Sequence, residues 1–212
     1  MITVNNSTGF PNWSQLNNYD EPYSTCNVTS AINAAQCCGF DIMALRRSND
    51  LNKRPADDLY EFLHSDAECL AMRDRLVKQA GLDSDYPPNE LMEVLSFGLG
   101  KWLKAPGMVD IHFGYPLALI MDHIIAGGCG ILHGHYPTQK SEIDHMNAVV
   151  GLSYDDTGLV SFIIDDPYGD YRQLYSIHVG NDITMPLCDI VKYIKNVKDV
   201  HNKDIILIRR KD

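Results

Sequence analysis

The chain changes its apolar pattern once, near Gly128, and this change restricts the folds that it can adopt. Before Gly128, apolar residues recur at helical spacing, as Ala31, Ile32 and Ala35 do. After it, short runs rich in β-branched and aromatic residues alternate with turn-forming residues. Helices followed by an antiparallel sheet define an α+β fold.

The same patterns predict individual elements. Helices are predicted over 26–39, 56–65, 66–81, 87–104, 115–128 and 185–196, and strands over 129–136, 145–154, 158–165, 171–179 and 204–210. No stretch rich in Gly, Ser or Pro marks a boundary between domains. We therefore expect one domain over 1–212, with a helical lobe over about 14–126 and a sheet lobe over about 127–212.

Composition excludes two classes of partner. The chain has 212 residues, of which 45% are hydrophobic, and a formal net charge of −10. The negative charge disfavours a nucleic-acid backbone as partner. The longest apolar stretch begins at Pro116 and is interrupted by Asp122 and His123, so it is too short to cross a bilayer. We expect neither a nucleic-acid partner nor a membrane partner.

The N-terminal residues contain no basic segment followed by an apolar run, so we expect no signal peptide. Without such a signal, the six cysteines are expected to be reduced thiols. Glycosylation sequons occur at Asn5, Asn6, Asn12 and Asn27. We expect them to remain unmodified, as in a bacterial or phage cytoplasm, with action at the cell wall after release or as part of a virion.

Cys26 lies where a polar stretch interrupted by proline changes into a helix of small residues. With Ser24 or Thr25 as N-cap, its sulfur falls in the first helical turn, where unpaired amide groups and the helix dipole favour a thiolate. A nucleophilic cysteine also needs a base, usually a histidine that a third group orients. Gln15, together with the Cys26 backbone N–H, is a candidate donor to the oxyanion of a tetrahedral intermediate.

His145 is the candidate base because of its place in a predicted hairpin. If Tyr154 pairs with Leu159, position 145 lies opposite position 168. Asp166 is then a diagonal neighbour of His145 on the same face, and Asp165 points the other way. A turn with one residue more or fewer would exchange the two aspartates.

Two blocks of the sequence, roughly 13–39 and 127–175, carry a family resemblance. The first contains "QLNNY" and "TCNVTS", and the second contains "HMNAVVGLSYDD" and "DDPYGD". In this order they resemble the papain-fold cysteine peptidases related to bacteriocin-processing double-glycine peptidases, especially the stand-alone phage and bacterial members. The resemblance implies a papain-like fold in which a helical N-terminal lobe carries the nucleophile helix and packs on an antiparallel sheet.

By this resemblance Gln15 is the oxyanion residue, Cys26 the nucleophile, His145 the base and Asp166 the acid that orients it. One departure is Asn27, which stands where the processing peptidases usually have glycine after the cysteine. It favours the phage-like branch over removal of leader peptides.

Hydrolysis of an amide bond through a thioester is therefore the expected activity. The resemblance suggests peptidoglycan stem peptides as substrate, for an endopeptidase of the phage-lysin or wall-remodelling kind. A peptidase that processes proteins after glycine and an inactive papain-fold binding protein are the alternatives. Contacts with substrate are expected from Asn27, His133, His135 and Asn147.

Neither a metal nor another cofactor is expected. His133 and His135 share one face of a predicted strand, and with His145 they could form a zinc site. No carboxylate or cysteine stands at a familiar ligand spacing from them, which makes a wet strand face beside the substrate groove the better interpretation.

Overall fold

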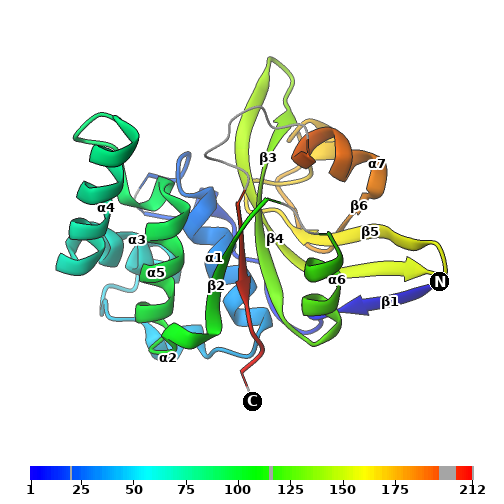
Figure 1. Cartoon of the computed structure of the whole chain (residues 1–212), viewed down its shortest axis with the longest axis horizontal. Coiled ribbons are helices and arrows are strands. Elements are labelled where there is room, and N and C mark those ends of the chain that lie inside the picture. Colours follow the sequence, from blue (N-terminus) through cyan, green and yellow to red (C-terminus); the bar gives the residue numbers. More distant parts are fainter. Residues whose placement is uncertain (20, 115–116, 196–203, 212) are drawn as a thin grey trace.

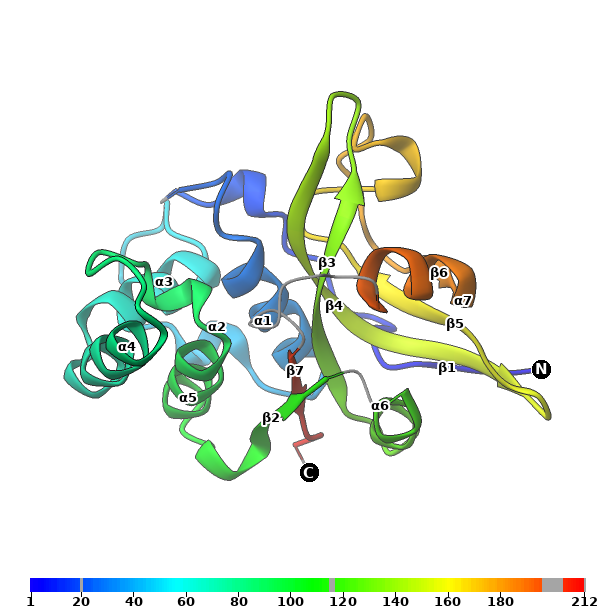
Figure 2. The same cartoon turned by 45° about the horizontal axis from the view of Figure 1, so that its top comes forward.

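A computed structural model describes residues 1–19, 21–114, 117–195 and 204–211. In it an antiparallel sheet separates two groups of helices (Figures 1 and 2). The strand order is β2-β7-β3-β4-β5-β6, and β1 also pairs with β4. The α+β class expected from the sequence is confirmed.

The strands are β1 (Ile2–Asn5), β2 (Val109–Phe113), β3 (Cys129–Pro137), β4 (Glu142–Asp155), β5 (Gly158–Asp165), β6 (Ile183–Pro186) and β7 (Asp204–Ile208). The α-helices are α1 (Cys26–Cys37), α2 (Ile42–Leu45), α3 (Pro55–Ser65), α4 (Ala67–Ala80), α5 (Met92–Trp102), α6 (Leu117–Ile125) and α7 (Leu187–Asp189). Short helical turns are η1 (Gln15–Asn17), η2 (Pro88–Glu90), η3 (Pro106–Met108) and η4 (Tyr171–Gln173), and α7 continues as the π-helix η5 (Ile190–Lys195).

α1 is the central helix of the first layer, and every residue from Asn27 to Cys37 is buried. It packs between the sheet and the other helices (Figure 1). Its Ala and Val residues let it approach β3 and β4 closely, and Ser30 Oγ donates to the carbonyl oxygen of Met146 at 2.8 Å. The helix ends before Gly39, whose φ of +88° suits glycine. The helix that carries Cys26 is thus held rigidly against the sheet.

A second hydrophobic core covers the opposite face of the sheet. Ile120 and Ile124 of α6 and Ile190 and Ile194 of η5 contribute to it, as does Phe162 of β5. Burial on both faces explains why the central strands read as nearly continuous apolar runs.

Two register shifts between β4 and β5 cancel each other. Tyr154 pairs with Leu159 as expected, but the next pair is Ser153 with Ser161, which leaves an extra residue in β5. A later shift leaves Val150 as an extra residue in β4. The register beyond the second shift is therefore the one that an uninterrupted hairpin would have.

The strand predicted over 171–179 is wrong. Leu174 and Tyr175 have φ angles of 50° and 59°, in the left-handed region that an extended strand excludes. The segment instead forms a closed loop in which Asp170 N donates to Ile177 O and Tyr175 N to Asp170 O. This loop lies beside Asp166 and becomes part of the site.

The short strands β1, β2 and β6 were not expected from the sequence. β2 pairs with β7, and α6 packs on the second core, although both precede residue 127. Helices and strands are therefore not divided at 126 and 127, because the sheet includes β1 and β2, which both precede residue 127. Residues 115, 116 and 196, which the predicted helices included, lie outside the described residues.

The described residues also bear on disulfides and on membrane-spanning helices. In the described structure the six cysteines form no disulfide with one another. Within the described ranges, no helix combines the length and apolarity needed to cross a bilayer.

A polar stripe on α1 holds the segment that leads to Gln15. Asn33 Oδ1 accepts from Trp13 N at 2.8 Å, and Asn33 Nδ2 donates to Trp13 O at 3.1 Å. One turn later, Gln36 accepts from Trp13 Nε1 and donates to Pro11 O. The buried side chain of Asn33 thereby replaces a strand partner for this part of the backbone.

Replacing Asn33 by leucine should lower the free energy of unfolding by about 2–3 kcal/mol, because both main-chain groups of Trp13 lose their buried partner. Urea denaturation followed by circular dichroism measures the change. Asn52→Leu, at an exposed position, is the control and should cost far less. Equal costs for the two variants would contradict this role of Asn33.

Candidate active site

The structure brings His145 and Asp166 into contact. His145 lies on β4, Asp166 follows β5, and Nε2 of the imidazole is 2.7 Å from Oδ1 of the carboxylate. Both residues are buried, with exposed fractions of 2% and 1%. The same Oδ1 accepts from the backbone N–H groups of Tyr168 and Gly169, at 3.0 and 3.3 Å. The backbone thus holds the Asp166 carboxylate in place, and the carboxylate in turn orients the His145 ring.

The protonation of His145 follows from three opposed effects. Burial lowers its pKa, but the Asp166 carboxylate and a hydrogen bond with the Cys26 sulfur raise it to about 10. Asp166 occupies Nε2, so Nδ1 is the ring nitrogen left for the sulfur. At neutral pH His145 is therefore favoured as an imidazolium, with the Asp166 carboxylate on one side of the ring and the Cys26 sulfur on the other.

Tyrosine rings enclose the imidazole. Tyr136, Tyr168 and Tyr175 lie edge-on to His145, with ring centroids at 6.0, 6.2 and 5.7 Å. These rings limit the access of water to the His145–Asp166 hydrogen bond, which strengthens it electrostatically.

Cys26 is the first residue of α1, as expected, and Thr25 occupies the N-cap position. The Thr25 side chain makes no capping bond; its Oγ1 instead accepts from Asn18 Nδ2 at 2.9 Å. In the first turn, Val28 N donates to Asn27 Oδ1 at 2.7 Å, so the N–H groups of Cys26 and Asn27 are the candidates for the sulfur or for a ligand beside it. Cys26 is half-buried, whereas Cys69 is fully buried, which raises the pKa of the Cys69 thiol to about 12.

Gln15 and Cys26 line one cavity, and the backbone of Gln15 is hydrogen-bonded to the loop that follows Asp166. Its backbone N donates to Pro167 O at 2.9 Å, and its Nε2 donates to Pro22 O at 3.0 Å. One Nε2 proton is left for a ligand, which is what an oxyanion donor requires. Ser14 Oγ donates to the same Pro167 oxygen, at 3.2 Å.

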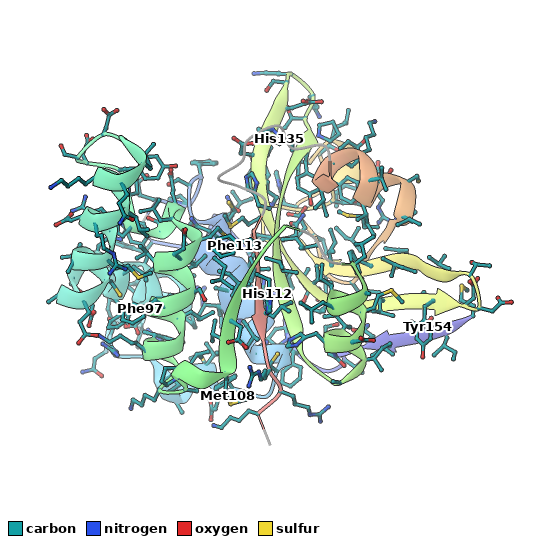
Figure 3. The ribbon with its side chains drawn as sticks, in the orientation of Figure 1. Phe97, Met108, His112, Phe113, His135 and Tyr154 are labelled. Carbon is teal, nitrogen blue, oxygen red and sulfur yellow. The ribbon has the colours of Figure 1, made fainter. Side chains whose placement is uncertain are left out.

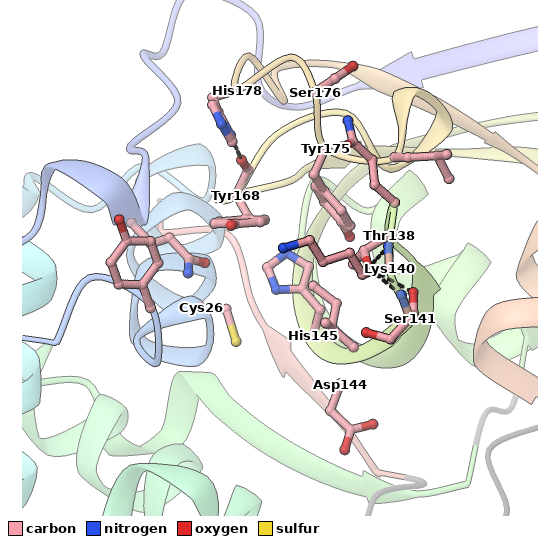
Figure 4. A pocket seen from close by; sticks show the side chains of 15 residues that line it. Cys26, Thr138, Lys140, Ser141, Asp144, His145, Tyr168, Tyr175, Ser176 and His178 are labelled. Atoms are coloured by element: carbon pink, nitrogen blue, oxygen red, sulfur yellow. Dashed lines mark hydrogen bonds between the residues drawn. The ribbon is translucent and has the colours of Figure 1, made fainter.

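Two cavities meet at Cys26 and His145. The larger, of about 870 Å³, is lined by Gln15, Tyr23, Cys26, Thr138, Gln139, Lys140, Ser141, Ile143, Asp144, His145, Tyr168, Leu174, Tyr175, Ser176 and His178. The smaller, of about 340 Å³, is lined by Tyr23, Ser24, Cys26, Asn27, Tyr86, Glu90, His133, Asp144, His145 and Met146. In Figure 4, Cys26 and the 138–141 turn lie on opposite sides of His145. Together the cavities form a groove across the thiol.

Asn147 does not meet the expectation that it contacts substrate. It is fully buried and lines neither cavity. With its amide nitrogen toward Asp166 Oδ2, at 3.2 Å, its oxygen accepts from Tyr136 OH at 3.0 Å. Asn147 thus holds the second carboxylate oxygen in place.

Asn27 and His133 lie in the wall of the smaller cavity. Asn27 is buried, and its Nδ2 donates to Asn89 O at 2.7 Å, so it also ties the start of α1 to η2. Contact of Asn27 and His133 with substrate remains a prediction.

His135 lines neither cavity. It lies toward the tip of the β3–β4 hairpin (Figure 3), where its Nδ1 is 2.8 Å from Asp144 Oδ1. Because Asp144 lines both cavities, His135 can influence the groove by orienting this carboxylate. His145 pairs with Gly134 across the strands, so it points to the other sheet face from His133 and His135. No cluster suited to a metal occurs among the described side chains.

Asp165 makes no contact with His145, in keeping with the expected choice of Asp166. Its Oδ1 accepts from Asp182 N at 2.9 Å. Burial raises the pKa of Asp165 to about 7. The two adjacent aspartates thus serve opposite faces of β5.

Several residues of the site were missed from the sequence. Lys140 in the hairpin turn and Glu90 after α4 were not singled out, and the loop residues Tyr168, Tyr175 and His178 were assigned to a turn or a strand. The available signal was the concentration of tyrosine and histidine just after "DDPYGD", which is unusual for a surface strand.

Comparison with known proteins bears on the fold. No family model and no curated protein matches the sequence. A solved structure does match: the crystal structure of a "putative C39-like peptidase from Bacillus anthracis", with a TM-score of 0.51, 16% identity and all of both chains covered. The chain therefore has the α+β fold of a C39-like peptidase. The stand-alone phage branch remains a prediction.

The pH dependence of activity should reveal the His145–Asp166 pair. The imidazolium is present below its pKa of about 10 and is lost as the pH rises through that value. The pH–activity profile should therefore have an alkaline limb, on which activity falls near pH 10. Asp166→Asn removes the attraction and should shift the limb down by about one to three pH units. Asp165→Asn is the matched control and should leave the limb in place. An unchanged limb in Asp166→Asn would contradict the assignment.

Gly180 tests the backbone that supports Asp166. The carbonyl oxygen of Gly180 accepts from Asp166 N at 2.8 Å. A Cβ at position 180 would clash with the backbone carbonyl oxygen of Asp166. Gly180→Ala should therefore displace the carboxylate and lower activity by about 100-fold. Gly107→Ala, whose Cβ meets nothing within 4 Å, should retain wild-type rates in the same assay. Full activity in Gly180→Ala would show that this support is dispensable.

Proposed function

We propose that the protein is a cysteine peptidase that cleaves an amide bond through a thioester on Cys26. It rests on a buried imidazole that Asp166 holds through Nε2 and that lines one cavity together with the Cys26 sulfur at the start of α1. Such a nucleophile, base and orienting acid is the arrangement of nucleophilic hydrolases on several folds. The C39-like peptidase fold supports the same conclusion.

Acylation uses each of these groups in turn. The Cys26 thiolate attacks the carbonyl carbon, and the resulting oxyanion accepts hydrogen bonds from Gln15 Nε2 and the Cys26 backbone N–H. His145 then donates its Nδ1 proton to the leaving nitrogen as the C–N bond breaks. The products of this half-reaction are a free amine, a thioester and a neutral imidazole.

Deacylation reverses the proton transfers. Neutral His145 removes a proton from a water molecule, which attacks the thioester carbonyl. The carboxylic acid leaves, and Cys26 and His145 return to the thiolate and imidazolium. Asp166 remains ionised throughout and stabilises the imidazolium.

For the substrate, we propose peptides of bacterial peptidoglycan, cut by an endopeptidase of the lysin or wall-remodelling kind. The resemblance of the "TCNVTS" and "DDPYGD" blocks to stand-alone members of the double-glycine peptidase group supports this choice. The volume of the groove, about 870 Å³ in its larger cavity, favours a substrate with side chains over a bare Gly-Gly segment. An inactive binding protein is disfavoured because Cys26 and the His145–Asp166 pair lie at one cavity.

Gln15→Ala separates an oxyanion donor from a structural residue. Hydrolysis of purified muropeptides should slow by about 100-fold, the effect of one lost oxyanion donor. Alkylation of Cys26 by iodoacetamide should keep its wild-type rate, because that displacement forms no oxyanion. Gln79→Ala, on the exposed face of α4, should change neither rate.

Cys26→Ser should abolish hydrolysis in the same assay, measured by chromatography of the muropeptides. Hydrolysis that persists in Cys26→Ser would overturn the thioester route. Hydrolysis of Gly-Gly peptides but not of muropeptides, by the wild type, would favour the processing alternative.

A further inference from the structure

The groove has two arms of different charge. We call the 870 Å³ cavity the large arm and the 340 Å³ cavity the small arm. They share Tyr23, Cys26, Asp144 and His145, so the thiol lies at their junction. A peptide held across Cys26 would thus place the residues on either side of the cleaved bond in different arms.

The large arm presents a cation from the β3–β4 turn. Lys140 lines this arm, and no carboxylate of the described residues forms an ion pair with it. The turn that carries it is rigid, because Thr138 Oγ1 accepts from the backbone N–H groups of Lys140 and Ser141. A groove lysine without an ion pair to a described carboxylate is notable in a chain with 18 Lys and Arg residues and 28 Asp and Glu residues.

His178 adds a polar group to the same arm. Its Nδ1 donates to Tyr168 O at 3.0 Å, which directs the ring's other nitrogen away from that carbonyl. Tyr168 and His178 lie together on one side of His145 in Figure 4. Asp144 also lines this arm, but its Oδ1 lies 2.8 Å from His135 Nδ1 and it points away from Tyr168 and His178 (Figure 4). The part of the large arm at Lys140 and His178 therefore suits a carboxylate better than an ammonium group.

The small arm has the opposite character. Glu90, at the end of η2, lines this arm, and no ion pair joins it to a described Lys or Arg. Asp144 also lines the small arm, and its side chain points away from Tyr168 and His178 (Figure 4). The phenol rings of Tyr23 and Tyr86 complete the wall and can pack against an alkylammonium chain.

We propose that the groove selects a peptide with a negatively charged group in the large arm, at Lys140, and a positively charged group in the small arm, at Glu90. This inference rests on the proposed function for the position of the cleaved bond between the two groups. Both charges are solvent-accessible, so each contributes modestly, and their opposite placement sets the direction in which the chain lies.

Alkylating peptides test this preference without requiring hydrolysis. Two probe series, chloroacetyl-Gly-Gly-X-amide and acetyl-X-Gly-Gly-chloromethyl ketone with X as Glu, Lys or Gln, place the charge on one side or the other of the reacting carbon. The readout is the second-order rate of Cys26 modification by mass spectrometry. Lys140→Glu should slow the Glu probe about fivefold relative to the Gln probe, the effect of one exposed ion pair. Glu90→Lys should slow, by a similar factor, the Lys probe of the series that extends in the opposite direction.

Matched charge reversals distinguish a local effect from the field of the whole protein. Lys78→Glu on α4 and Asp156→Lys in the β4–β5 turn make the same changes of charge outside both arms. They should leave the ratios of the probe rates unchanged. Equal ratios in all four variants, or equal shifts in the controls, would overturn the proposal.

The outcome is separable from that of the proposed function. If charge-selective labelling is seen while no peptide is hydrolysed, the peptidase proposal fails and the charge preference stands. If peptides are hydrolysed while labelling ignores charge, the preference fails and the peptidase proposal stands.

Discussion

The hydrogen bond between His145 Nε2 and Asp166 Oδ1 is the constraint on which the site depends. It joins a residue of β4 to the residue that follows β5, so it exists only at one register of the β4–β5 hairpin. A net slip of one residue would bring Asp165 to the place of Asp166. The two opposed register shifts preserve the pairing, and Asn147 and the backbone at 168 and 169 hold the carboxylate.

One loop coordinates the two halves of the proposed chemistry. The carbonyl of Pro167 accepts from Gln15 N, and the residue before it is the acid that orients His145. The oxyanion donor and the base are therefore positioned by consecutive residues of the same segment. On the other side, Asn33 fixes the chain before Gln15 to the helix that carries Cys26. The four proposed catalytic groups thus share one connected backbone frame.

Local patterns predicted much of this arrangement. Helical spacing after Cys26 and alternation around His145 predicted α1 and the hairpin, because both depend on nearby residues. Loop geometry was beyond such patterns: Tyr175 has a β-forming side chain, yet it and Leu174 both have positive φ angles in the folded loop. The burial of Asn147 and the two charged arms depend on segments far apart in the chain, which a single sequence does not place together.

The protonation state of His145 is the most direct test of the account. Nitrogen-15 NMR of the labelled ring, recorded from pH 5 to 10, reports it without a substrate. We expect an imidazolium signal that persists through pH 9 in the wild type, with loss of the proton near pH 10. A ring that titrates near its ordinary value of about 6.5 would show that Cys26 and Asp166 do not hold the proton, and would contradict the proposed catalytic pair.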